Sequence, residues 1–275
     1  MALRRQPALA ATLTGVILTM AYAITLRRLA DQWSSDEDMG HAFLVPVVIA
    51  WVIWRERSRL ASLTAQPSVW GLLPFCAGIC LHQLAALGAG LFVDSVSMIL
   101  SIAGAVVCIA GLEYLRTWSF PLLLSLFMLP KLAFVYNAIT LPLQLFASRV
   151  AAWMLTATHA AVVNREGNIL DIGGRRLLVA EACSGIRYLL PLGFIALVFA
   201  YCFDSKVWMR AALLCVAIPV AIFANSLRVA FVAIFPSLET GARHTFIGAA
   251  IFVVCLIALP AAQTLFNGIH DRVRS

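Results

Sequence analysis

The residues of this chain that could carry out chemistry begin with a cysteine in a polar setting. Cys183 lies in the stretch EACSGIR, between Glu181 and Arg187, where a polar segment gives way to a long apolar run. The thiolate is the reactive form of cysteine, and a helix N-terminus or a nearby cation lowers the pKa of a thiol below about 8.5. Ser184 can cap the helix that is expected to follow. Cys183 is therefore a candidate nucleophile.

Two further residues have the types that nucleophilic acyl transfer requires. His244 could take the thiol proton and return it to a leaving amine. Arg228 keeps its charge in proteins, so it would instead stabilise an oxyanion or hold a substrate carbonyl or carboxylate. Taken singly, Cys183 could be structural and His244 an interface residue. Arg228 lies within an apolar run, where charges are rare and usually functional. We predict that Cys183, Arg228 and His244 are catalytic.

Four second-rank residues could support this set: His41, Glu181, Arg187 and Asn225. Asn225 precedes Arg228 by three residues, so on a helix the two share a face. Arg187 follows Cys183 by four residues, one helical turn away. Three other histidines have no partner in view and are expected to be structural: His82, His159 and His270.

The composition determines the class of protein. Of the 275 residues, 62% are hydrophobic and 12% charged, whereas soluble domains are roughly 45–50% apolar and about 25% charged. No soluble core could bury so much apolar side chain, so the chain is a polytopic membrane protein. The net charge of +7 comes from arginines scattered at the ends of apolar runs. This pattern is typical of membrane borders and excludes a nucleic-acid partner.

A membrane-spanning helix needs about 20 apolar residues. Eight segments meet or approach this length: 8–26, 41–54, 69–90, 92–112, 118–136, 184–203, 208–235 and 244–266. The first resembles a secretory signal, but many spans follow it, so we expect a retained helix. A ninth segment, 138–163, contains Arg149 and fits an interfacial or re-entrant helix better. We predict an all-α membrane protein of about eight transmembrane helices, forming one domain over residues 1–275.

The positive-inside rule orients this fold. Compact basic clusters are expected on the cytoplasmic side: Arg4 and Arg5, Arg55 to Arg59, Arg116, Lys206 and Arg210, and Arg272 and Arg274. Both termini are then cytoplasmic. The polar stretch 164–182 reads as a short extracytoplasmic hairpin around Gly173-Gly174 that leads to Cys183. The three predicted catalytic residues then lie on one, outer, face. Counting 138–163 as a crossing would instead place the termini on opposite sides.

The seven cysteines contain no CxxC pair, and no cluster has the spacing of metal ligands. Six of them lie within apolar runs, where a thiol behaves as a small hydrophobe. We expect neither a disulfide framework nor a metal or organic cofactor.

Four blocks of sequence resemble the exosortase/archaeosortase family of membrane cysteine transpeptidase-like enzymes. They are DMGHAFLVP, AEACSGIRYLL around Cys183, NSLRV around Arg228 and RHTFIG around His244, in order over roughly positions 36–248. Ala42 stands where the family's first signature usually has glycine. The cysteine block is specific, and the others gain weight in combination.

The resemblance implies that Cys183, Arg228 and His244 are catalytic. It implies exported protein substrates with a PEP-CTERM-type signal: a short Pro-Glu-Pro-like motif, a transmembrane helix and a basic cytoplasmic tail. The enzyme would be a multi-pass protein of the bacterial inner membrane, with its active site facing the periplasm and the lipid bilayer around it.

Three alternatives stay open on the sequence. A plain intramembrane cysteine protease would differ only in using water to resolve the thioester. A transporter or channel would use Arg228 and His41 to line a polar path. A non-catalytic membrane scaffold would have an inert Cys183.

Overall fold

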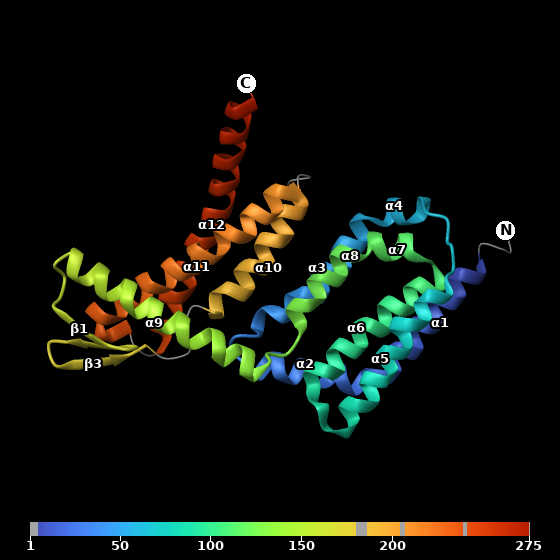
Figure 1. The fold of residues 1–275 in the computed structure, drawn as a ribbon, viewed down its shortest axis with the longest axis horizontal. Coiled ribbons are helices and arrows are strands. Elements are labelled where there is room, and N and C mark those ends of the chain that lie inside the picture. The colour runs from blue at the N-terminus through green and yellow to red at the C-terminus, as the bar shows by residue number, and fades with distance from the viewer. Residues whose placement is uncertain (1–4, 180–185, 204–206, 239–240, 275) are drawn as a thin grey trace. The chain divides into compact units, whose positions relative to one another are not determined.

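The computed structural model describes residues 5–179, 186–203, 207–238 and 241–274, and most of them are helical (Figure 1). The chain forms two compact units, Met1–Leu132 and Ala133–Ser275. The prediction of a single domain stays a prediction.

The described residues include four helices long and apolar enough to cross a membrane. If the bent helix pair Leu9–Ala21 and Ala23–Ser35 forms a single span, the number of candidate spans rises to five. Three shorter apolar helices accompany them: Gly40–Arg55, Ser119–Met128 and Arg187–Phe203. The nearly all-helical membrane class is confirmed, whereas eight full spans are not confirmed by the described residues.

The first unit consists of helices joined by tight connections. Its α-helices are α1 (Arg5–Ala21), α2 (Ala23–Ser35), α3 (Leu44–Arg55), α4 (Arg57–Ser62), α5 (Leu72–Leu84), α6 (Gly90–Ile109), α7 (Leu112–Thr117) and α8 (Ser119–Ser125). Short 3₁₀-helical turns are η2 (Gly40–Phe43), η3 (Val69–Gly71) and η5 (Leu126–Met128), and η4 (Ala85–Ala89) is a π-helical turn. The apolar run 118–136 is thus interrupted at 129–132, which is not helical.

Helices α5 and α6 pack closely side by side because small residues face each other. A Cβ on Gly78 would collide with Ser101, and one on Gly104 would lie 2.5 Å from the backbone nitrogen of Phe75. The chain reverses between the two helices at Gly88, whose φ of 115° favours glycine.

A buried polar network fastens the bend between α1 and α2 to this helix pair. The Thr25 hydroxyl donates to Asp94 Oδ2 at 2.8 Å, and His82 Nδ1 lies 2.7 Å from Asp94 Oδ1. The hydroxyls of Tyr22 and Ser101 are 2.9 Å apart. Buried polar groups need such partners. His82, for which the sequence offered no partner, therefore has one in Asp94.

The second unit combines long helices with a small sheet. Its elements are α9 (Ala133–Ala157), β1 (Val163–Glu166), β2 (Ile169–Ile172), β3 (Arg175–Leu178), α10 (Ile186–Phe203), α11 (Val207–Ile234), η7 (Pro236–Leu238) and α12 (Gly241–Arg274). The strands are antiparallel in the order β1-β2-β3. Gly173 and Gly174, with φ of 61° and 87°, form the two-residue turn between β2 and β3. Strand β1 was not predicted, and the sheet's extracytoplasmic position stays a prediction.

Three apolar clusters of described residues hold this unit together, two of them large. Leu170, Leu177 and Val179 of the sheet region pack with α9 and with α11, where Val229 is a contact residue. The second cluster joins α10, α11 and α12 through small residues of α11, among them Ala217, Ala221 and Ala224. Because alanine has little side chain, α11 can lie between its two neighbours at short range.

Candidate functional site

Arg228 lies in the last two turns of α11 and is almost completely buried, with 2% of its surface exposed. Its guanidinium carbon is 5.5 Å from the centre of the Tyr188 ring, which belongs to the first turn of α10. This distance is within the range of a cation–π interaction, which gains strength when both groups are desolvated. The Arg228 guanidinium thus lies inside the protein against an aromatic face.

Gly248 of α12 allows this arrangement. A Cβ at this position would lie 2.6 Å from the Tyr188 hydroxyl oxygen and 3.6 Å from the Arg228 guanidinium carbon. A side chain would displace the tyrosine, so only glycine lets α12 approach. Tyr188 also stacks on Phe252 of α12, with ring centres 6.3 Å apart. The starts of α10 and α12 and the end of α11 therefore converge on Arg228.

The predicted site residues of the second unit fall around this point. His244 belongs to the first turn of α12, one turn before Gly248. Asn225 is fully buried one turn before Arg228, and Arg187 is half-buried in the first turn of α10. Cys183 and Glu181 lie outside the described residues.

The chain that leads toward Cys183 is fixed at Val179. The Val179 N–H donates to the Asn168 carbonyl at 2.9 Å, and the Asn168 side-chain amide donates to the Val179 carbonyl at 3.3 Å. That amide also donates to Gln144 of α9 at 3.2 Å. Val179 is buried in the same cluster as Val229, the neighbour of Arg228. The sheet therefore holds this chain segment against the end of α11.

The model of the transmembrane exosortase family matches residues 33–260, which include most of each unit and all three predicted catalytic residues. The chain belongs to the transmembrane exosortase family. No curated protein and no solved structure matches it. The predicted family is therefore confirmed, and the protein is a membrane protein of that family, whereas the catalytic roles stay predictions.

This exosortase family member carries the segment around His41 in its first unit. His41 lies in the turn η2, and its Nδ1 is 3.2 Å from the Asp38 carbonyl oxygen. Nearby, Lys131 Nζ is 2.9 Å from Asp36 Oδ1 and 2.8 Å from Asp38 Oδ2. Burial lowers the pKa of Lys131, but the hydrogen bonds and negative charges of Asp36 and Asp38 raise it by more, so the pKa of Lys131 lies above its usual value. Lys131 thus stays charged and fixes the turn that bears His41.

Sequence reasoning missed Tyr188, Gly248 and Arg175. Tyr188 and Gly248 stand within the blocks around Cys183 and His244, and Gly248 follows His244 by one helical turn. Arg175 of β3 donates to the Val232 carbonyl of α11 at 3.3 Å and to the Ala233 carbonyl at 2.5 Å. Its only sequence signal was a charged residue beside a glycine turn. Among the described residues, no three His, Cys, Asp or Glu side chains are grouped as metal ligands.

Proposed function

We propose that this exosortase family member is a membrane cysteine protease or transpeptidase that removes the C-terminal sorting signal of exported proteins at the outer face of the inner membrane. The proposal rests on the buried Arg228, which packs against the Tyr188 ring and lies close to Gly248. Tyr188 belongs to the sequence block around Cys183 and lies in the first turn of α10, and Gly248 belongs to the block around His244 near the start of α12. The family match covers all of these positions.

In the proposed reaction, the Cys183 thiolate attacks the carbonyl carbon at the sorting motif. The Arg228 guanidinium donates hydrogen bonds to the oxyanion, where loss of one donor typically costs about 10²–10³-fold in rate. His244, protonated by the thiol, gives its proton to the leaving amine as the C–N bond breaks. An acceptor amine, or water, then attacks the thioester and releases Cys183.

An open surface hollow of about 470 Å³ borders the first turns of α12, lined in part by Arg243, Phe246 and Ile247. It supports the proposal by offering space beside the turn that contains His244.

The test uses the full chain in membranes with a tagged substrate that ends in a PEP-CTERM-type signal. Mass spectrometry of the substrate's C-terminus compares the wild type with Cys183→Ala, and Cys215→Ala is the matched control because Cys215 is an exposed residue in an apolar helix. We expect processing that only Cys183→Ala abolishes. An added mass on the product identifies a transferase, and its absence a protease. A Cys183→Ala protein that still processes substrate refutes the covalent step.

The same assay isolates the contribution of Arg228. Arg228→Lys keeps the charge but loses the planar group that stacks and donates in a fixed geometry. Arg210→Lys is the matched control, because Arg210 of α11 lies 5.3 Å from the ring of Tyr201 of α10 in the same kind of contact. We expect a loss of about 10²-fold for Arg228→Lys alone. Equal losses in both variants would assign Arg228 a packing role only.

A further inference from the structure

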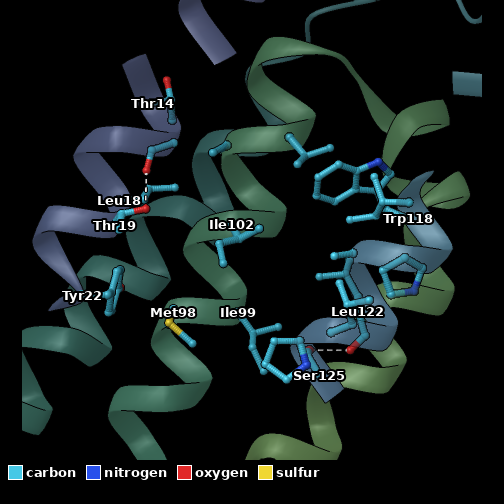
Figure 2. A pocket seen from close by; sticks show the side chains of 18 of the residues that line it. Thr14, Leu18, Thr19, Tyr22, Met98, Ile99, Ile102, Trp118, Leu122 and Ser125 are labelled. Atoms are coloured by element: carbon cyan, nitrogen blue, oxygen red, sulfur yellow. Dashed lines mark hydrogen bonds between the residues drawn. The ribbon is translucent and has the colours of Figure 1, made fainter. Parts of the chain in front are cut away.

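The first unit contains an apolar groove that the proposed reaction does not use. Its volume is about 690 Å³. Figure 2 shows its two walls: Thr14 and Leu18 of α1, Tyr22 between α1 and α2, and Ile102 of α6 on one side, and Leu122 of α8 on the other. The remaining lining residues are mostly leucine, isoleucine, valine and alanine.

The groove follows a helix of membrane-crossing length. Along α6 it extends from Ser95 to Ile109, a rise of about 21 Å. The hydrocarbon core of a bilayer is about 30 Å thick. An occupant of the groove would therefore lie along most of one membrane-spanning segment.

One wall of the groove is built from small residues. Ala11, Gly15 and Thr19 of α1 recur every four residues and all line it. A Cβ added to Gly15 would meet no atom within 4 Å. The space beside Gly15 is therefore open to an occupant.

The end of the groove at Leu60 and Tyr114 is basic. These two residues are joined by a hydrogen bond of 3.1 Å from the Tyr114 hydroxyl to the Leu60 carbonyl. Four exposed arginines flank them in sequence, Arg55, Arg57, Arg59 and Arg116. Arg59 lies 3.9 Å from Glu56 and Arg116 is paired with Glu113, so this end keeps a net positive charge. Arg57 stacks on Trp54 at 4.2 Å, and Trp54 is 60% exposed, as is typical of a residue at a membrane interface.

We propose that this groove binds an anionic phospholipid, with its acyl chains along α6 and its phosphate at Arg57 and Arg59. Charge complementarity selects this occupant. A transmembrane helix could also pack on small residues, but its cytoplasmic flank normally carries Lys and Arg, which the arginines would repel. Anionic lipids are attracted by about fivefold in affinity for each nearby arginine. This lipid site is independent of the proposed catalysis.

The first test measures lipid retention by native mass spectrometry of the full chain. The protein is offered palmitoyl-oleoyl phosphatidylglycerol or the phosphatidylcholine with the same acyl chains. We expect a preference for phosphatidylglycerol of roughly 25-fold, from about fivefold for each of two arginines. Gly15→Leu fills the open space and should abolish retention of both lipids. Gly268→Leu is the matched control, because Gly268 is a glycine of α12 that also has open space beside it.

The second test addresses the headgroup. The double variant Arg57→Gln and Arg59→Gln should retain both lipids equally, because it keeps the groove and removes the charge. Arg176→Gln with Arg272→Gln, a change of equal charge at two exposed positions of the second unit, should keep the preference. Soluble glycerol 3-phosphate should not compete, since it lacks acyl chains.

Three results would overturn the lipid site. They are equal retention of the two lipids by the wild type, retention that survives Gly15→Leu, and a protein captured by p-benzoylphenylalanine placed at Thr14 in living cells. The last result would assign the groove to a transmembrane helix of a partner. A lipid-mass adduct at Thr14 supports the proposal even if Gly15→Leu fails to fold.

Discussion

Arg228 combines burial and charge, and two neighbours make the combination possible. The face of Tyr188 compensates part of the lost hydration, and such contacts contribute about 2 kcal/mol when desolvated. Gly248 supplies the second condition, because α12 can approach only where no side chain projects. Tyr188 is therefore a positioning residue whose orientation depends on a glycine of another helix.

Gly248→Ala should disrupt this arrangement. Its Cβ would lie 2.6 Å from the Tyr188 hydroxyl oxygen, and overpacking of this kind typically costs about 1–3 kcal/mol. We expect a lower melting temperature in detergent and slower processing of the sorting signal. Both are measured on the purified full chain.

Tyr188→Phe provides the decisive control. The next atoms from the added Cβ are those of Arg228, at 3.6 Å, so removing the hydroxyl should relieve the clash. Gly248→Ala should therefore be tolerated in the Tyr188→Phe background, and the two changes should show a coupling energy of about 0.5–3 kcal/mol. Additive effects of the two changes would contradict this account.

At the scale of elements, the sheet serves to dock one chain segment on α11. Arg175 extends from β3 to the carbonyls of Val232 and Ala233, which end the helix and have no partner within it. Val179, at the end of the sheet region, packs with Val229. The sheet and α11 are thereby coupled at the position that precedes the Cys183 segment.

Arg175→Gln should weaken this docking. Hydrogen bonds from a charged donor contribute about 1.5–3 kcal/mol, so we expect greater hydrogen exchange in β2 and β3 and a slower reaction. Arg176→Gln is the matched control, because Arg176 is the exposed neighbour on the same strand. Equal exchange in the two variants would show that the sheet is held by its apolar contacts alone.

The elements also show what hydropathy could and could not predict. The apolar runs predicted the helices, and the pair Gly173-Gly174 predicted the β2–β3 turn, because both features depend on local residue types. The 61° bend between α1 and α2 and the break at 129–132 were not predicted. They depend on tertiary contacts such as those of Tyr22 with Ser101 and of Lys131 with Asp36.

The site was predicted in the same uneven way. Arg228 could be identified because a charge in an apolar helix stands out. Tyr188 and Gly248 are ordinary residues of an apolar sequence, and their importance arises only when α10 and α12 meet at Arg228. The pair His82 and Asp94 was missed for the same reason, since it joins two helices that fold back on each other.

At the scale of the whole molecule, the decisive element is α9. Whether α9 crosses the membrane determines the side of the membrane on which the C-terminus lies. The helix is 25 residues long and apolar enough to span a membrane. One feature opposes a crossing. Arg149 is exposed on α9, about 6 Å along the axis from the middle of the helix, and a cation near the bilayer centre costs about 2.5–3.5 kcal/mol.

We therefore expect α9 to lie at the interface and both termini to be cytoplasmic. Green fluorescent protein should fluoresce when fused to either end, and alkaline phosphatase inserted at the Gly173-Gly174 turn should be active. An insertion after Ser62, beside the basic helix α4, is the cytoplasmic control and should be inactive. Termini on opposite sides would mean that α9 crosses and that Arg149 reaches a headgroup by extending along the helix. In that case the contact of Arg149 with lipid headgroups would determine how deep α9 lies in the membrane.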